Sequence, residues 1–166
     1  RIVWVRIKSD RIPQRPTPSK GMSSGSRHLA HRSAVQALYQ WELTGQSAAE
    51  IEPGFISDDA YSGVNRDYFL QLIENIPGNC ASLDECLGPC LSRELDSLDP
   101  VERSILRLAT YELLHEPKIP HKVVLNEAVE LCRIFGSEEG YRFVNGVLDC
   151  LSKQIQQGKE SRLPAC

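Results

Sequence analysis

The sequence predicts an all-α fold, and three observations support this prediction. Apolar residues recur three and four positions apart through most of residues 27–156, which is the spacing of helices with one buried face. Proline, glycine and capping residues divide this pattern into about seven segments of helical length. No segment shows the alternation of apolar and polar residues that is typical of a half-buried strand. Short connections make sequential helices antiparallel, so we expect a helical bundle, which a break near residues 92–99 divides into an N-terminal set over about residues 27–95 and a C-terminal set over about residues 96–156.

The first predicted helix begins at Arg27 and closes at Gly45. Ser47 and Glu50 have the spacing of a capping box, which opens a short second helix. Residues 57–65 are rich in Asp, Ser, Gly and Asn, and we expect them to form a loop. The apolar face of the first helix consists of Ala30, Ala34, Leu38 and Trp41.

The next two predicted helices both meet a proline. The first is expected to break at Pro77, and the second is expected to kink or end at Pro89, because proline lacks the N–H that continues a helix. Their apolar residues are Tyr68, Phe69, Leu72, Ile73 and Ile76 in the first helix, and Leu83, Cys86, Leu87 and Cys90 in the second.

A strong helix start follows at Asp99, which has N-cap chemistry and precedes Pro100. This helix ends near His115, and residues 120–151 then predict a helical hairpin. We expect Gly136 to adopt the left-handed conformation that stops the first arm of the hairpin. Ser137 is the expected N-cap of the second arm, with Glu138 and Glu139 in its first turn.

The N-terminal part of the chain has the composition of a disordered extension. Residues 1–21 contain three prolines and no helical period, and we interpret them as upstream sequence, with Met22 as the natural start. A transit peptide is the alternative interpretation, because the segment is rich in arginine and poor in acids. The domain is then expected to begin near residue 27, after an extension over residues 1–26, and to end before a flexible tail over residues 157–166.

The charge of the chain is unevenly distributed. Residues 1–33 contain six arginines and two lysines against one acid, whereas the remaining chain contains 11 basic and 21 acidic residues. A basic arm on an acidic body suits a polyanion at one end, although a solvated tail is the simpler interpretation. No apolar run approaches the roughly 20 residues that cross a bilayer.

Six cysteines are present, and none of their spacings is typical of a zinc site, which usually contains a C-x2-4-C pair. We interpret them as reduced thiols, mostly in the core, because no secretory signal precedes them. The chain also lacks a glycine-rich phosphate loop, an HExxH motif and a GxSxG motif. We therefore predict a binding protein with no metal and no cofactor, and not an enzyme.

Three segments together resemble the NusB family of transcription antitermination factors. They are AVQALYQWELTG (residues 34–45), LSRELDSLDPVERSILRLATYEL (residues 91–113) and IPHKVVLNEAVELCRIFGSEEGYRFVNGVLD (residues 119–149). The resemblance runs from about Arg27 to Leu151 and includes the specific pattern P-x-K-V-x-x-N-E-A-x-E-L followed by F-G and F-V-N-G-V-L-D. It implies a non-catalytic, all-α protein of two three-helix-type subdomains in the bacterial cytoplasm.

The resemblance also implies the partners. Family members pair with the ribosomal protein NusE, and the pair binds the boxA segment of nascent ribosomal RNA, so that RNA polymerase and other Nus factors read through terminators. Some members form homodimers. The residues that match the RNA-binding positions are Arg27, His28, His31, Arg32, Tyr141, Arg142, Phe143 and Asn145, and those that match the partner-binding positions are Tyr39, Glu102 and Glu139.

One departure from the family pattern concerns the N-terminal arm. His28 and His31 stand where other members often have arginine, so fewer phosphate contacts and weaker RNA binding are expected. Phe143 is also open to a second interpretation, because a phenylalanine at such a position is more often part of the core than a platform for a base. Two alternative functions stay open: the N-terminal module of a ribosomal RNA cytosine methyltransferase, and a helical adaptor without RNA binding.

Overall fold

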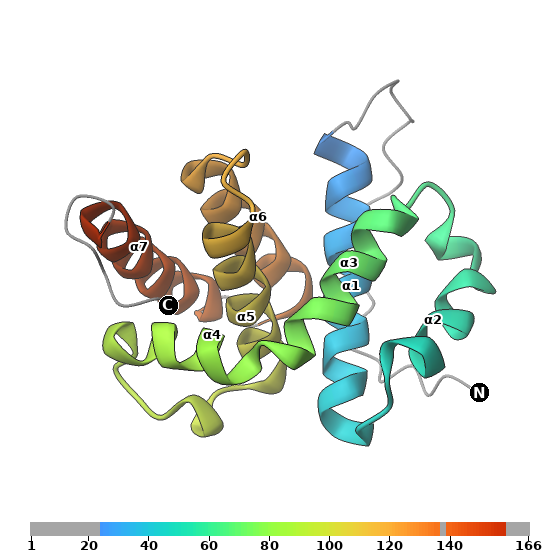
Figure 1. The fold of residues 1–166 in the computed structure, drawn as a ribbon, viewed down its shortest axis with the longest axis horizontal. Helices are drawn as coiled ribbons and strands as arrows, with labels where there is room; N and C mark the ends of the chain where they lie inside the picture. The colour runs from blue at the N-terminus through green and yellow to red at the C-terminus, as the bar shows by residue number, and fades with distance from the viewer. Residues whose placement is uncertain (1–23, 137–138, 159–166) are drawn as a thin grey trace. The chain divides into compact units, whose positions relative to one another are not determined.

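The computed structural model describes residues 24–136 and 139–158, and all the regular structure in these ranges is helical (Figure 1). This result confirms the predicted all-α fold. The α-helices are α1 (Ser24–Thr44), α2 (Ala48–Ile56), α3 (Arg66–Gly78), α4 (Cys80–Leu87), α5 (Pro100–His115), α6 (His121–Phe135) and α7 (Gly140–Gly158). The short 3-10 helices are η2 (Asp59–Tyr61), η3 (Gly88–Cys90) and η4 (Leu95–Ser97).

The ends of the helical region differ slightly from the prediction. Helix α1 begins at Ser24, so the last three residues of the predicted extension over residues 1–26 are helical. Helix α7 continues to Gly158, into the segment predicted as a flexible tail. The remaining parts of both terminal predictions lie outside the described residues, as do the predicted N-cap Ser137 and its neighbour Glu138.

The chain forms two compact units, the first ending at Pro77 and the second beginning at Gly78. The sequence pattern placed this division near residue 95, after the helix that is now α4. Helix α4 belongs to the second unit because its buried residue Leu83 faces the core and its Asp84 carboxylate forms an ion pair with Arg107 of α5.

The first unit packs α1, α2 and α3 around aromatic side chains. Phe69 of α3 is fully buried, and its ring centroid lies 5.3 Å from that of Phe55 and 5.3 Å from that of Tyr61. The predicted capping box is confirmed: the Glu50 backbone N–H donates to Ser47 Oγ, and the Ser47 N–H donates to Glu50 Oε2 at 2.7 Å. Helix α3 includes Pro77 in its last turn and ends one residue later than predicted, because a proline near a helix end removes only one hydrogen bond.

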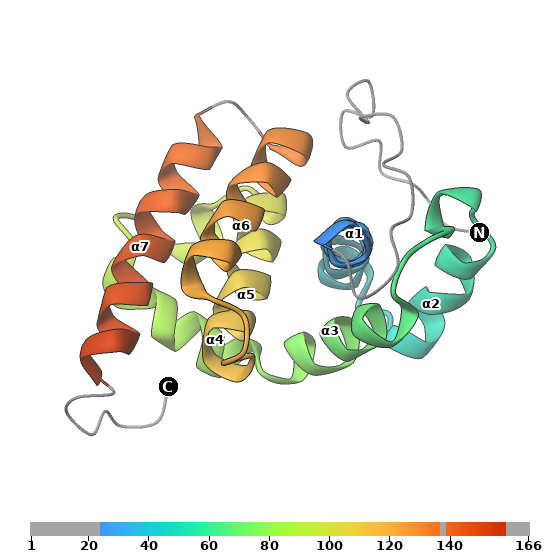
Figure 2. The same ribbon diagram turned by 90° about the horizontal axis from the view of Figure 1, so that it is seen from above.

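The second unit is built on α5, which lies beside α6 and α7 in both views (Figures 1 and 2). The predicted start of α5 is confirmed, because the Val101 N–H donates to Asp99 Oδ1 at 2.8 Å and Pro100 occupies the first turn. Side chains on most of its circumference are buried. These residues include Val101, Ser104, Ile105, Leu106, Leu108, Ala109, Thr110, Tyr111 and Leu113.

The predicted hairpin is formed by α6 and α7. The sequence places Val124, Ala128, Leu131 and Phe135 on one apolar stripe of the first arm, and Val144, Val147, Leu148, Leu151 and Ile155 on one stripe of the second. All of these side chains are buried except that of Ile155, which is partly exposed. At the base of the hairpin, His121 Nδ1 and Ser152 Oγ share a hydrogen bond of 2.6 Å.

Gly136 stops α6, but the prediction of a left-handed conformation is wrong. Its φ of −101° and ψ of −169° are extended, and its N–H donates to the carbonyl of Cys132 at 2.7 Å. A Cβ atom at this position would lie 2.9 Å from that same carbonyl oxygen. Glycine is therefore required here by the close approach of the backbone, and not by a positive φ.

The cysteines do not follow the prediction of reduced thiols throughout. Cys90 of η3 and Cys150 of α7 form a disulfide, with their Cα atoms 5.8 Å apart. This distance lies in the usual range for disulfides, and it arises because η3 packs against α7. Cys86 and Cys132 are buried thiols outside the disulfide, in agreement with their predicted place in the core.

Two kinds of feature are not found among the described residues. No helix there is both long enough and apolar enough for a bilayer crossing. The same residues contain no cluster of three or more His, Cys, Asp or Glu side chains with the geometry to hold a metal ion.

We predict that Gly136→Ala lowers the free energy of unfolding by about 1–3 kcal/mol, because the new Cβ collides with backbone that cannot move freely. The matched control is Gly146→Ala on α7, where nothing lies within 4 Å of the added atom. Alanine in an exposed helix interior should raise the free energy of unfolding by about 0.5–1 kcal/mol. Urea denaturation measures both changes, and a neutral Gly136→Ala would contradict the proposed clash.

We also predict a pH-dependent effect at Glu102, whose side chain in the first turn of α5 is 8% exposed. Burial, with a smaller contribution from Asp99, raises the pKa of this carboxyl above its ordinary value of 4.5, and Arg93 opposes the shift. Since the folded chain then binds the proton more tightly than the unfolded chain, ionisation of Glu102 destabilises the fold at neutral pH. Glu102→Gln should raise the melting temperature at pH 7, and this gain should vanish below pH 4.5.

The control for this prediction is Glu85→Gln on α4, where the side chain is exposed. This variant should match the parent chain at both pH values in thermal unfolding followed by circular dichroism. A gain for Glu102→Gln that persists at low pH would show that its cause is packing and not the charge.

Candidate nucleic-acid interface

The basic arm of the first unit lies in the first turns of α1. Arg27 and His28 are partly exposed there, and Arg32 lies one turn further along the helix. Burial lowers the pKa of the Arg32 guanidinium, which shows that this side chain is partly withdrawn from water. A cation in such a place gains more from an anionic partner than a fully solvated one, because less water screens the interaction.

His31 is the exception among the predicted arm residues. It is 1% exposed, and its ring meets that of Tyr68 edge to face with the centroids 5.7 Å apart. Helical spacing places it on the buried face that also includes Ala34 and Val35, three and four positions further on. We therefore assign His31 to the packing of the first unit and no longer to direct RNA contact.

The second unit brings arginines and aromatic rings together where α6 ends and α7 begins. The guanidinium carbon of Arg133 lies 4.9 Å from the ring centroid of Tyr141, and that of Arg142 lies 5.7 Å from it. Arg142 Nε donates a hydrogen bond of 3.2 Å to Tyr141 Oη. This bond is the main cause that lowers the pKa of the Tyr141 phenol, and it also raises the pKa of Arg142.

A second pair of the same chemistry lies further along α7. The guanidinium carbon of Arg93, from the segment between η3 and η4, lies 4.4 Å from the ring centroid of Phe143. Arg93 is exposed and Phe143 is partly exposed, so this ring is not a closed part of the core. A cation–π contact at an exposed site contributes only about 0.5–1 kcal/mol, so Arg93 can be displaced from the ring.

We call Arg93, Arg133, Tyr141, Arg142 and Phe143 the Arg–aromatic cluster. Its guanidinium groups can pair with phosphate, and its rings can stack on bases that are not in a duplex. Asn145, which the sequence also predicted as an RNA contact, is exposed on the same helix. The structure therefore pairs two of the predicted aromatic rings with arginines in two separate groups, Arg93 with Phe143 and Arg133 and Arg142 with Tyr141.

The RNA contacts that the family resemblance implies include neither Arg93 nor Arg133. Neither has a local signal, because each meets its aromatic partner across a helix boundary or from a separate segment. The spacing of Arg133 and Tyr141 on either side of the hairpin corner is the one feature from which their contact could have been inferred.

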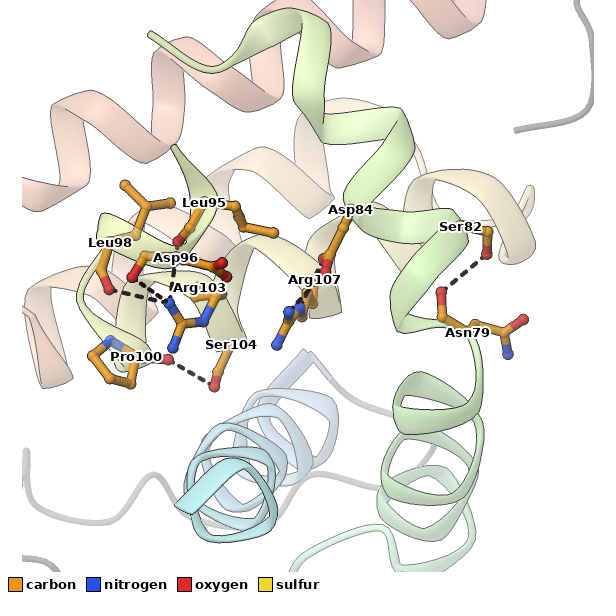
Figure 3. A network of polar contacts seen from close by, with 10 residues as sticks. All are labelled: Asn79, Ser82, Asp84, Leu95, Asp96, Leu98, Pro100, Arg103, Ser104 and Arg107. Carbon is orange, nitrogen blue, oxygen red and sulfur yellow. Dashed lines mark hydrogen bonds and ion pairs between the residues drawn. The ribbon is translucent and has the colours of Figure 1, made fainter. Parts of the chain in front are cut away.

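Two other arginines, Arg103 and Arg107, form hydrogen bonds that stabilise the fold (Figure 3). Arg107 donates through Nε and Nη2 to the two carboxylate oxygens of Asp84, both at 2.8 Å. Arg103 Nη1 donates to the carbonyl oxygens of Leu95, Asp96 and Leu98 at 3.1–3.4 Å. These bonds fasten α4 and the η4 segment to α5.

The predicted partner-binding residues have different surroundings. Tyr39 is partly exposed on α1 of the first unit, and Glu139 is exposed just before α7 in the second. Glu102 is mostly buried, and the charges of Glu102 and Asp99 add to the burial that raises the pKa of Cys132 to about 12. Glu102 thus has little surface to offer a partner, whereas Tyr39 and Glu139 have more.

Comparison with known proteins gives the family of the chain. The model of the NusB family matches residues 28–153. The transcription antitermination protein NusB of Nitrosococcus oceani is 46% identical over 133 residues, which cover 80% of this chain and 89% of that protein. NusB of Pseudomonas fluorescens is 41% identical over 155 residues, which cover 91% of this chain and 93% of that protein.

Solved structures give the same result. The structure of T. maritima NusB is similar with a TM-score of 0.67 and 30% identity, over 84% of this chain and 94% of that one. A complex of antitermination factors NusB and NusE with double-stranded RNA contains a chain similar at a TM-score of 0.65 and 29% identity, over 80% of this chain and 99% of that one. From its sequence, its helices and these relatives, the chain belongs to the NusB family.

Proposed function

We propose that this chain acts in transcription antitermination as a non-catalytic protein that pairs with NusE and binds boxA RNA of nascent ribosomal transcripts. The observation that carries the proposal is its similarity, over four-fifths of its length, to a chain solved with NusE and double-stranded RNA. The curated relatives are antitermination proteins that the chain spans over about nine-tenths of their length, which favours this role over a methyltransferase module. Its place is then the bacterial cytoplasm, beside RNA polymerase and other Nus factors.

The proposed RNA contacts lie on both units. Arg27, His28 and Arg32 supply positive charge on α1, and the Arg–aromatic cluster with Asn145 supplies charge, stacking faces and an amide on the second unit. Phosphate contacts of this kind give affinity without sequence preference, whereas stacked and hydrogen-bonded bases add selectivity. Phe143 is the proposed stacking platform, because its ring is partly exposed.

The proposed NusE contacts are Tyr39, Glu102 and Glu139. Glu139 offers an exposed carboxylate and Tyr39 a partly exposed ring with a polar tip, which is common chemistry at protein interfaces. Glu102 is mostly buried, so it can offer NusE only a small surface, and its carboxyl interacts with the charges of Asp99 and Arg93. A homodimer is the competing assembly, because a second copy could cover surface meant for NusE or RNA.

We predict that the basic arm makes only a small contribution to the salt dependence of RNA binding by the isolated protein. The described part of the arm contains two arginines, Arg27 and Arg32. The two histidines contribute less, because His28 has an imidazole in place of a guanidinium and His31 is buried. Each phosphate contact contributes about 0.7–0.9 to the slope of log affinity against log salt concentration. For a chain that begins at Met22, changing both Arg27 and Arg32 to alanine should therefore lower the slope measured with boxA RNA by at most about 1.4–1.8, the share of two contacts, and a larger drop would contradict the prediction.

We predict that the double variant Arg27→Ala and Arg32→Ala weakens RNA binding by the NusE complex roughly tenfold at moderate salt. Co-purification with NusE should be unchanged, because neither arginine is among the proposed partner contacts. Fluorescence anisotropy with labelled boxA RNA measures the affinity.

The control is Arg66→Ala, which removes one positive charge, against two in the double variant, from an exposed arginine that is paired with Glu52 in the first unit. It should bind RNA like the parent chain. An equal loss of RNA affinity in the control and the double variant would show that the arm acts only through the net charge of the protein. No RNA binding by the intact complex would favour an adaptor without RNA.

A further inference from the structure

The disulfide between Cys90 and Cys150 lies beside the Arg–aromatic cluster. Cys90 is three residues before Arg93, and Cys150 is seven residues after Phe143, so each cysteine shares its segment with one member of the stacked pair. Seven residues are close to two helical turns, which places Cys150 and Phe143 on the same side of α7. The disulfide and the contact between Arg93 and Phe143 therefore both attach the segment before α5 to the same side of α7.

The segment between α4 and α5 is fastened unevenly. Its second half is held to α5 by the hydrogen bonds from Arg103 to the carbonyls of Leu95, Asp96 and Leu98 (Figure 3). Its first half, residues 88–94, is largely exposed and meets α7 through the disulfide and the Arg93 contact. After cleavage of the disulfide, the cation–π contact of Arg93 and the packing of η3 are left to hold this half of the segment against α7.

We propose that Cys90–Cys150 is a thiol–disulfide exchange site for a dithiol reductant, and that its reduction releases residues 88–94 and uncovers the ring of Phe143. Both cysteines are partly exposed, and exposed Gly88 and Pro89 adjoin the bond, so a thiolate can approach. Two other cysteines of the second unit, Cys86 and Cys132, are buried, and burial raises the pKa of Cys132 to about 12, whereas Cys80 is partly exposed but lies outside the disulfide. The two buried thiols are poor partners for exchange.

The exchange consists of two balanced steps. A thiolate of the reductant attacks one sulfur of the disulfide, forms a mixed disulfide with it, and expels the other sulfur as a thiolate that takes up a proton. The second thiol of the reductant then attacks the mixed disulfide, so the reductant leaves as its own disulfide and the chain carries two thiols. Two electrons and two protons pass to the chain.

The geometry favours a dithiol over a monothiol. After the first step, the expelled thiolate is still held near the mixed disulfide, because the two Cα atoms lie 5.8 Å apart in the closed fold. This thiolate can therefore attack the mixed disulfide and expel a monothiol reductant, which restores the original bond. A dithiol reductant instead closes its own cyclic disulfide before this reversal occurs. Dithiothreitol should thus reduce the bond where reduced glutathione at the same thiol concentration leaves most of it intact.

The first test is labelling of the folded chain with N-ethylmaleimide, read by peptide mass spectrometry. Cys90 and Cys150 should be unlabelled before treatment and labelled after dithiothreitol, while Cys86 and Cys132 stay unlabelled throughout. Labelling of Cys90 and Cys150 without reductant would overturn the proposal. Reduction that occurs only in denaturant would do so as well, since the bond would then be purely structural.

The second test follows release of the segment by hydrogen exchange. Amides in residues 88–94 should exchange about tenfold faster in the reduced chain, and those held through Arg103 should be unchanged. Cys150→Ser should match the reduced chain and ignore dithiothreitol. The matched control Cys80→Ser, which replaces a thiol outside the disulfide, should keep the redox response. Equal exchange of residues 88–94 in both redox states would exclude the release.

The last step, the effect on RNA, rests on the proposed function. Because Arg93 covers a face of Phe143 in the oxidised chain, the reduced chain should bind labelled boxA RNA about fivefold more tightly, as expected for one added stacking face. Phe143→Ala should remove this difference. Equal affinity in both redox states, with labelling that shows the change, would contradict the gating. No binding in either state would contradict the proposed function, while labelling and exchange still decide the redox site.

Discussion

The burial of α5 is the constraint on which the second unit depends. Ile105 and Leu106 are adjacent in sequence and both are fully buried, so this helix has no face given entirely to water. A helix with such a wide apolar surface must be covered on several sides, and α4, α6 and α7 supply that cover. The start of α5 is fixed just as firmly, because Asp99 caps its N-terminus. The neighbouring elements take their positions from a helix that cannot shift without exposing its core.

This arrangement also divides the arginines between structure and binding. Arg103 and Arg107 project from α5 toward backbone carbonyls and a carboxylate that they satisfy in fixed geometry (Figure 3). Arg93 is exposed and its guanidinium lies over the partly exposed ring of Phe143. Arg133 is also exposed and meets Tyr141, but it forms an ion pair of 2.8 Å with Glu130 as well. A guanidinium stacked on a ring can still offer its N–H edges to phosphate, whereas one that donates to a carboxylate offers fewer of them. Residue type alone would not separate these two groups, although their surroundings do.

Local signals explain why so much of the fold could be predicted from the sequence. Helical spacing and capping depend on residues within one or two turns, and both the Ser47 cap and the Asp99 cap are as expected. Contacts between distant segments have no such signal. Cys90 and Cys150 are 60 residues apart, and the burial of His31 depends on α3 covering its face with Tyr68. The residue types of the candidate site could therefore be predicted from the sequence. The contacts that these residues make with other segments of the chain could not.

Helix α7 joins the core, the candidate RNA contacts and the disulfide in one rigid element. Val144, Leu148 and Leu151 anchor one side of it in the core, so its rotation and its register against α6 are fixed. Phe143 and Cys150 lie along the flank of that buried stripe, and any group attached to Cys150 is thereby held at a set distance from Phe143. A covalent change at the cysteine can reach the aromatic ring without repacking the core, because the segment that carries Arg93 moves while α7 does not.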